Sequence, residues 1–235
     1  AARSETGSMA SDDRSIDGVL AQAGAVRAIG VEAAFDAAAT LASQPPASGG
    51  NVVVVTTVGG WGVVAADAIA RSRHLRLDPL PGDLVAAIDH LLPPRWSRNN
   101  PIDMAGGETR DTVPEVLRLV ASHPATDAVL FLGLGIQSNQ AALMRSGGFY
   151  PDFGLERIVD YHERQDDRYG RAAAEVSEAT GKPILCATEL AVTHSNNAAP
   201  AAVAATGRYC AASAERAVAA LDASLSGWAG TEVRQ

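Results

Sequence analysis

The sequence predicts an α/β fold in which helices cover both faces of a mostly parallel, doubly wound sheet. Short apolar runs alternate with segments of helical periodicity, in units of about 30–40 residues. The apolar runs are continuous, which is typical of strands buried on both faces. A glycine-rich turn joins the first strong run to a helical segment, as it does in many βαβ units.

Residues 1–44 precede a connection rich in proline, serine and glycine at residues 45–50. Apolar spacing predicts helices over residues 12–24 and 31–43, with Ser11 or Asp12 as the first N-cap. Because 44 residues are too few for a separate core, we expect an N-terminal helical arm packed on a main domain at residues 51–227.

The segment from Asn51 to Ile69 is the centre of the predicted fold. Four consecutive valines predict a buried strand, and a helix is predicted to start at or just after Trp61. Glycines in the turn between them let the backbone approach a ligand, and the free N–H groups of the first helical turn favour an anion. The same glycines can also serve turn geometry alone. No Lys-Ser or Lys-Thr pair follows the turn, which argues against a Walker A loop.

The alternation continues to the end of the chain. Further strands are predicted at residues 75–77, 127–133, 182–187 and 207–210, and further helices over residues 83–92, 109–120, 155–180, 198–205 and 214–225. Residues 97–107 and 135–153 are rich in turn formers and predict irregular loops. The charged middle of the 155–180 helix is interpreted as a solvated outer face rather than a binding patch.

Ligands of such sheets bind at the carboxyl ends of the strands. Three predicted segments lie there: the glycine turn, the polar loop after Gly133, and the loop after Ala187 that contains His194. No metal-ligand spacing, Ser–His–Asp order or nucleophilic cysteine context is evident.

Composition narrows the function further. The net charge of −8, without a basic cluster, argues against a nucleic-acid partner. No apolar run approaches the ~20 residues of a membrane helix, and the polar N-terminus predicts no signal peptide. Cys186 and Cys210 lie in apolar segments and are interpreted as reduced thiols, so we expect a cytoplasmic protein. The chain does not begin with methionine, and we expect it to be a piece of a longer protein.

Four segments, in order, resemble the motifs of one family. They are SETGSMA at residues 4–10, AQAGAVR with EAAFD at residues 21–36, TVGGWGVVAAD at residues 57–67, and NPID at residues 100–103. They are similar to the family's Ser-His-Thr-Gly loop, QAGV segment, TNGGGPGVLAAD segment and NPVD turn. The family is that of the NDP-forming acyl-CoA synthetases (acetate–CoA ligase, ADP-forming), which are relatives of succinyl-CoA synthetase. The resemblance is to their C-terminal flavodoxin-like CoA-ligase domain, and it weakens after about residue 133.

The resemblance implies a ligase chemistry in which a carboxylic acid, CoA and a nucleoside triphosphate give acyl-CoA, NDP and phosphate. A histidine on a swinging loop carries the phosphoryl group in that family, and helix N-termini hold it. By this resemblance, the loop comprises Ser4, Glu5, Thr6 and Gly7. The phosphate site comprises Gly59, Gly60, Trp61 and Gly62, and the wall of the acyl or phosphate site comprises Asn100, Asp103, Gly106 and Gly107.

The chain departs from the family at the histidine, where it has Glu5. A carboxylate is a poorer phosphoryl acceptor than a neutral imidazole. The step is lost, or Glu5 is itself phosphorylated, or Glu5 mimics the phosphate; we favour loss. His194 is the best substitute carrier. Trp61 stands where the family has a small residue or proline, and it would narrow the site.

The resemblance also implies partners. We expect no cofactor on this fragment, whereas the full enzyme would use CoA, ATP and Mg²⁺, a small-molecule acid, an ATP-grasp domain or subunit, and a CoA-binding Rossmann domain. The fragment alone should be inactive. The alternative is a non-catalytic regulatory or assembly domain that docks an ATP-grasp partner and senses phosphate or acyl-CoA. An adjoining ATP-grasp domain would favour the ligase, and an adjoining acetyltransferase-like domain would favour regulation.

Overall fold

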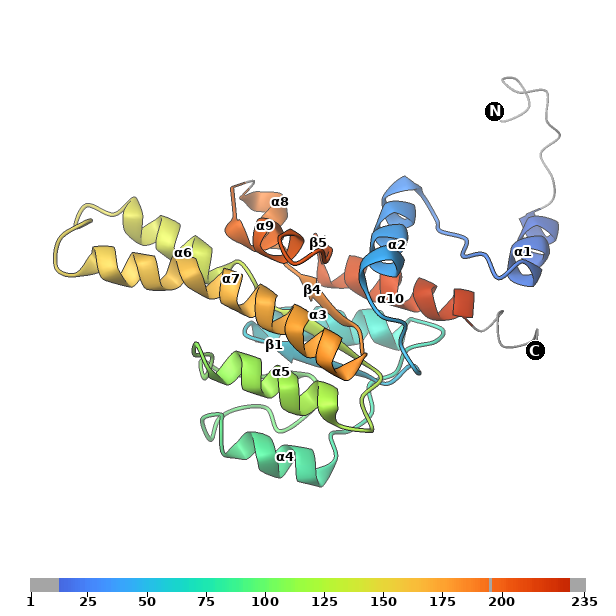
Figure 1. Cartoon of the computed structure of the whole chain (residues 1–235), viewed down its shortest axis with the longest axis horizontal. Coiled ribbons are helices and arrows are strands. Elements are labelled where there is room, and N and C mark those ends of the chain that lie inside the picture. Colours follow the sequence, from blue (N-terminus) through green and yellow to red (C-terminus); the bar gives the residue numbers. More distant parts are fainter. Residues whose placement is uncertain (1–12, 195, 229–235) are drawn as a thin grey trace, which may run out of the picture.

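A computed structural model describes residues 13–194 and 196–228. Its centre is a five-stranded sheet in the order β2-β1-β3-β4-β5, with every pair of neighbouring strands parallel (Figure 1). The strands are β1 (Val52–Thr56), β2 (Ile102–Asp103), β3 (Ala128–Leu132), β4 (Ile184–Ala187) and β5 (Cys210–Ala211). This is the flavodoxin-like strand order, and it confirms the predicted fold class.

Helices cover both faces of the sheet. The helices of the described residues are α1 (Asp13–Gln22), α2 (Val31–Ser43), α3 (Gly59–Ala70), α4 (Gly82–Asp89), α5 (Thr112–Ser122), α6 (Ile136–Arg145), α7 (Leu155–Thr180), α8 (Leu190–Thr193), α9 (Ala198–Ala204) and α10 (Ala214–Trp228). Residues of α4, α5, α7 and α9 form one buried cluster with the sheet, and residues of α3 and α10 form the other. The two cores explain the three-layer arrangement.

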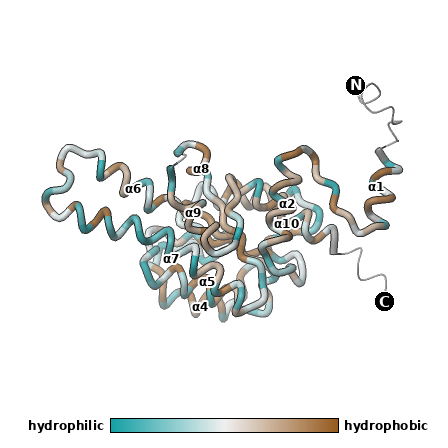
Figure 2. Tube along the Cα trace, turned by 45° about the horizontal axis from the view of Figure 1, so that its top comes forward, coloured by the Kyte–Doolittle hydropathy of each residue, from teal (hydrophilic) through white to brown (hydrophobic). Residues whose placement is uncertain are grey.

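The four valines of β1 show why this strand is apolar throughout. Val53 and Val55 belong to one core, whereas Val52 and Val54 belong to the other. Successive side chains of a strand point to opposite faces, so a central strand needs apolar residues at every position. Figure 2 shows the contrast with α7, where long hydrophilic stretches lie on the outside of the molecule.

The arm reaches the main domain through α2, which packs on α10. The side chain of Asp36 is buried there, and its two oxygens accept from Arg216 Nε at 2.6 Å and Nη2 at 2.8 Å. The hydroxyl of Tyr209 also donates to Asp36. Burial raises the pKa of Asp36, but the bonds from Arg216 and Tyr209 hold it below its ordinary value overall. The helix α1 extends away from the sheet (Figure 1). The predicted loop residues Ser4, Glu5, Thr6 and Gly7 lie outside the described residues, and the predicted division at residues 45–50 stays a prediction.

Most predicted elements are present, and four differ. Residues 75–77 form only an isolated bridge, between Asn51 and Arg76, instead of a strand. The predicted loop at residues 97–107 contains the two-residue strand β2, and the predicted loop at residues 135–153 contains the helix α6. The helix α3 begins at Gly59, two residues before Trp61. Apart from α6, which has ten residues, each difference concerns a short element or an element boundary, where local patterns are weakest.

Candidate functional site

The N-terminus of α3 lies at the carboxyl end of β1. Thr56 shapes the turn between them, because its hydroxyl accepts from the Val58 N–H at 3.0 Å and donates to the Val58 carbonyl at 2.8 Å. That carbonyl also accepts from the N–H groups of Trp61 and Gly62. The N–H groups of Gly59 and Gly60 find no acceptor among the described residues. Two free donors at a helix N-terminus are a suitable receptor for an anion.

The glycines of this turn serve different purposes. A Cβ on Gly59 would lie 2.5 Å from Asp103 Oδ2, and one on Gly62 would lie 3.1 Å from Thr56 Cγ2. Close packing therefore excludes side chains at both positions. Gly60 is exposed, and a Cβ there would meet no atom within 4 Å. Gly60 thus marks the open side of the turn, from which a ligand can approach the free N–H groups. Trp61 is half-buried and packs against the core under α3.

The carboxylate of Asp103 lies beside the first turn of α3. It is the last residue of β2, and its Oδ1 accepts from the Ala105 N–H at 2.9 Å. Its backbone N–H donates to Ser97 Oγ at 3.0 Å, which fixes the residue from the other side. A negative charge is favourable near a helix N-terminus. Asp103 therefore sets the local charge that an incoming anion meets.

The other predicted wall residues lie elsewhere. Asn100 is buried behind the strand β1: its Oδ1 accepts from the Val54 N–H at 3.0 Å, and its Nδ2 donates to the Val52 carbonyl at 2.8 Å. The Asn100 side chain thus bonds backbone groups of β1 that a neighbouring strand would otherwise pair. Gly106 and Gly107 lie against residues 93–95, where a Cβ on Gly107 would be 2.3 Å from a proline ring carbon. Of the four predicted wall residues, Asp103 is the one in close approach to the α3 turn.

The N-terminus of α6 lies at the same edge of the sheet, and a carboxylate of this chain already occupies it. Asp166 of α7 accepts from the Gly135 N–H at 2.8 Å and the Ser138 N–H at 2.9 Å, and also bonds the Ser138 hydroxyl, so it caps α6. Burial raises the pKa of this carboxyl group, although these hydrogen bonds act in the opposite direction. Beside it, His162 Nδ1 bonds the side chain of Gln137. The expectation that the whole charged middle of α7 is solvated is wrong for Asp166, which is fully buried.

The spacing of apolar residues in α7 indicates that Asp166 is buried, but the many charged residues around it led to the prediction of a solvated face. Val159, Asp166 and Ala173 recur every seven residues and lie on one buried face of α7. A carboxylate on that face must find donors, and the first turn of α6 provides them. Because α6 was not predicted, its donors could not be predicted either.

The third segment at this edge uses its polar residues mainly for caps. Asn197 donates to the Gly135 carbonyl at 2.9 Å and accepts from the Ala199 N–H at 3.0 Å, so it starts α9. Glu189 accepts from the Ala214 N–H at 2.9 Å at the start of α10. His194 is exposed at the end of α8, and its Nδ1 lies 3.4 Å from the Thr193 hydroxyl. Nothing in this geometry activates His194 as a nucleophile.

Other kinds of chemistry find little support in the described residues. Cys186 and Cys210 are free thiols on neighbouring strands. Burial raises the pKa of both, to about 12 for Cys210, so neither is a ready nucleophile. Within residues 13–194 and 196–228 no three His, Cys, Asp or Glu side chains are grouped to hold a metal ion. No helix in those ranges is long and apolar enough to cross a membrane.

Residues 52–137 match the family model of the Ligase-CoA domain. The matched range is about a third of the chain, and it contains β1, the α3 turn and Asp103. This agrees with the resemblance read from the four sequence motifs.

The curated proteins that the chain is similar to include ADP-forming CoA ligases. The chain is 35% identical over 132 residues to the acetate–CoA ligase [ADP-forming] I subunit alpha of Pyrococcus furiosus, covering 56% of this chain and 28% of that protein. It is 32% identical over 130 residues to the 4-hydroxybutyrate–CoA ligase [ADP-forming] of Nitrosopumilus maritimus, covering 55% of this chain and 18% of that protein. The matched part of the chain therefore covers less than a third of the length of either relative.

A solved structure shares the fold of this chain. It is the dinucleotide-forming acetyl-coenzyme A synthetase 1 of Ca. Korarchaeum cryptofilum in complex with phosphate and ADP. The superposition has a TM-score of 0.73 at 23% sequence identity, and it covers 97% of this chain and 44% of that chain. At this identity the likeness supports the fold alone.

Proposed function

We propose that this chain is the Ligase-CoA part of an ADP-forming acyl-CoA synthetase. Such an enzyme converts a carboxylic acid, CoA and ATP to acyl-CoA, ADP and phosphate. The observation that supports this most directly is the open N-terminus of α3, with two unpaired N–H groups, inside the range that matches the Ligase-CoA domain. ATP, Mg²⁺ and CoA belong to the full enzyme, and no site for them is assigned on this chain.

In this proposal the N-terminus of α3 receives the phosphoryl group that moves between active sites. The N–H groups of Gly59 and Gly60 donate to its oxygens, and the helix dipole stabilises its charge. The open side at Gly60 leaves room for this group to approach. Asp103 borders the receptor. Its negative charge repels a phosphoryl group, which favours release of that group after it has bound.

Glu5 changes the role of the swinging loop. A carboxylate is a poorer phosphoryl acceptor than a neutral imidazole, and loss of the nucleophile is the simplest account of Glu5. We therefore propose that the chain has lost the phosphohistidine step, while the scaffold that received the group is kept.

The partners follow from the incomplete length of the chain. The matches cover 28% and 18% of its curated relatives, and a complete reaction needs sites for nucleotide and CoA. We propose that an ATP-grasp domain or subunit and a CoA-binding Rossmann domain supply them. A regulatory or assembly role is the second candidate, and the replacement of the phosphoryl-carrying histidine by Glu5 is the observation that favours it.

Intact-mass spectrometry of the full-length protein tests the proposal. The protein is incubated with ATP and Mg²⁺, and separately with acyl-CoA and phosphate. The wild type should gain no phosphoryl group, whereas a Glu5→His variant should gain one at the new histidine. A phosphoryl group on Glu5 or His194 of the wild type would contradict the loss of the step. A Glu5→His variant that gains none under either condition would contradict the α3 receptor.

A further inference from the structure

The helices α6 and α7 form a hairpin that projects from the sheet, farthest to the left in Figure 1. The helix α6 packs on the first half of α7 and makes no comparable contact with another element. The match to the Ligase-CoA domain stops at residue 137, where this hairpin begins. The hairpin at residues 136–166 is therefore a feature outside the part of the chain that builds the α3 receptor.

Contacts at both ends hold the hairpin in one shape. Asp166 caps α6 at the base, as described above. Nearer the tip, Arg145 of α6 pairs with Glu163 of α7, and its guanidinium carbon lies 5.3 Å from the centre of the Tyr150 ring. Val159 is fully buried between the helices. A surface ordered in advance loses little entropy when it binds.

The tip of this ordered hairpin is apolar and exposed. Phe149 is 71% exposed, Phe153 is 85% exposed and Leu143 is 64% exposed. The centres of the two phenylalanine rings lie 6.1 Å apart in an edge-to-face arrangement, so the rings form one exposed aromatic cluster. Single exposed apolar residues are common, but a cluster of this kind on a projecting element is typical of an interaction site.

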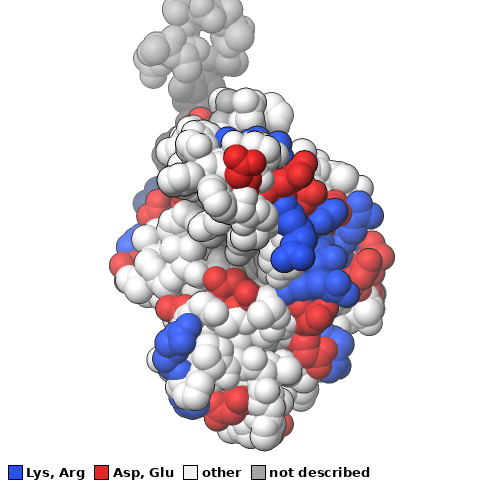
Figure 3. Space-filling view, turned by 90° about the vertical axis from the view of Figure 1, so that its left-hand side faces the viewer, with Lys and Arg blue, Asp and Glu red and all other residues white. Residues whose placement is uncertain are grey.

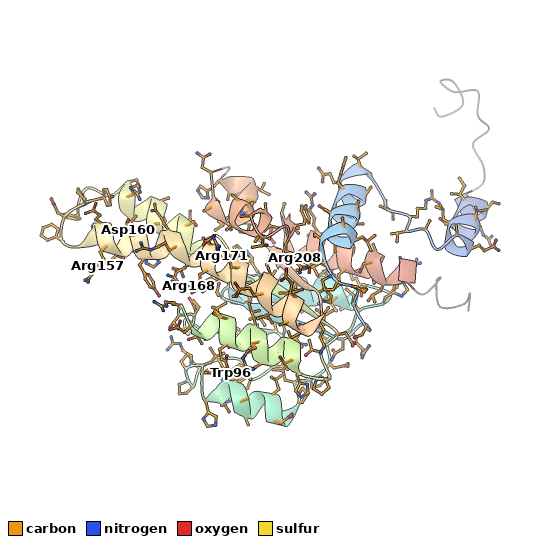
Figure 4. The ribbon with its side chains drawn as sticks, viewed as in Figure 1. Trp96, Arg157, Asp160, Arg168, Arg171 and Arg208 are labelled. Atoms are coloured by element: carbon orange, nitrogen blue, oxygen red, sulfur yellow. The ribbon has the colours of Figure 1, made fainter. Side chains whose placement is uncertain are left out.

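A stripe of arginines continues from the tip along the outer face of α7. Arg157, Arg164, Arg168 and Arg171 are spaced seven, four and three residues apart, which places them on one side of the helix. Figure 4 shows three of them spread along α7, and Figure 3, viewed from the hairpin end, shows basic side chains gathered on one flank. Arg171 pairs with Asp167. Arg157 and Arg164 are exposed and make no ion pair with any described residue.

We propose that the hairpin at residues 136–166, with the arginine stripe, is a docking arm for a protein surface that offers an apolar hollow bordered by carboxylates. Aromatic residues and arginine are the types that dominate binding at protein interfaces. The unpaired guanidinium groups of Arg157 and Arg164 supply the charge that the carboxylates complement. This inference does not depend on the phosphate receptor of α3.

The charge pattern favours a protein over other anionic partners. Residues 136–171 contain six carboxylates against five arginines, so the arm has no excess of positive charge. A nucleic acid or an anionic membrane binds through such an excess, which the arm lacks. A second copy of the chain fits poorly as well. A two-fold antiparallel pair of hairpins would set the arginine stripe of one copy against that of the other, which like-charge repulsion opposes.

Photo-crosslinking in the cells that encode the full-length protein tests the docking arm. The crosslinker p-benzoylphenylalanine replaces Phe149 at the tip, and a matched control replaces Phe35 of α2, which is also 71% exposed. The crosslinked peptides are identified by mass spectrometry. The test is repeated with Arg157→Glu and Arg164→Glu together, and with Arg14→Glu and Arg73→Glu as a charge-matched control.

We expect position 149 to crosslink to one protein surface whose peptide combines apolar residues with Asp or Glu. Reversal of Arg157 and Arg164 should lower the yield about tenfold or more, and the control pair should leave it within about twofold. Equal yields at positions 149 and 35, a crosslink to the hairpin of a second copy, to nucleic acid or to lipid, or a yield unaffected by the Arg157 and Arg164 reversal would each overturn the proposal. So would the absence of any crosslink.

Discussion

Replacement of Asn100 by alanine tests how the β1–α3 segment is held. The Asn100 side chain is 8% exposed, and it makes three hydrogen bonds to the backbone. Its Oδ1 accepts from the Val54 N–H at 3.0 Å, and its Nδ2 donates to the carbonyls of Val52 at 2.8 Å and Asp78 at 3.2 Å. Alanine can replace none of them.

The expected loss follows from which groups remain unpaired. Val52 and Val54 are fully buried, so the variant leaves one N–H and one carbonyl without a partner in the core. Each such group costs about 1–3 kcal/mol. Asp78 is half-buried, and water can reach its carbonyl. The free energy of unfolding should therefore fall by about 2–4 kcal/mol.

Urea unfolding of Asn100→Ala measures this loss, and Asn99→Ala is the matched control. Asn99 is the exposed neighbour and keeps its backbone contacts in the variant, so a change within about 0.5 kcal/mol is expected there. If Asn100→Ala lost less than about 1 kcal/mol, the role assigned to this carboxamide would be refuted.

A third variant, Asn100→Asp, separates the donors from the acceptor. It keeps an acceptor oxygen but sets a carboxylate beside two carbonyls, so the pKa of the new group should rise in the folded state. Its loss of stability should then shrink as the pH falls, because the protonated carboxyl can donate again. A loss that is equal at neutral and acidic pH would contradict this reasoning.

Three further predictions concern the N-terminal arm, the turn at Gly133 and the cap of α6. Bonds from Arg216 and Tyr209 hold the pKa of Asp36 below its ordinary value, so the stability that Asp36 contributes should be present above about pH 4 and lost as the pH falls further. Asp36→Asn should remove this pH dependence and lower the free energy of unfolding by about 1–3 kcal/mol at neutral pH, measured by thermal unfolding. A Cβ on Gly133 would lie 1.9 Å from Thr57 Oγ1 at a φ of 106°, so Gly133→Ala should cost about 2–4 kcal/mol, whereas Gly207→Ala, at a φ of 77° with no atom within 4 Å, should cost about 1–2 kcal/mol. Asp166→Ala should increase amide hydrogen exchange in α6 while the sheet stays protected, and unchanged exchange in α6 would show that Asp166 is not its cap.

The long elements were predictable because many residues agree on one pattern. The bounds of α2 and α7 match the prediction, and α7 ends at Gly181, whose φ of 67° suits a left-handed C-cap. The valines of β1 are equally clear, since both of their faces are buried. In such segments local propensity and tertiary packing point to the same structure.

The elements that were missed depend on contacts far along the chain. Half of the residues of α6 are polar, since it packs mainly on α7 and needs only a narrow apolar stripe. The strand β2 has two residues, and pairing with β1 defines it. At the site, the sequence indicated the glycine turn and Asp103, but the bonds of Asn100 to β1 join residues 46 and 48 positions apart. A local pattern contains no information of that kind.

Nuclear magnetic resonance of the ¹⁵N-labelled chain, titrated with inorganic phosphate at constant ionic strength against chloride, tests the central claim most directly. If the N-terminus of α3 is a phosphate receptor, the amide resonances of Gly59 and Gly60 should shift in a saturable way, and those of Gly135 and Ser138, whose N–H groups already bond Asp166, should not. Gly59 and Gly60 resonances that stay in place at every phosphate concentration would contradict the account.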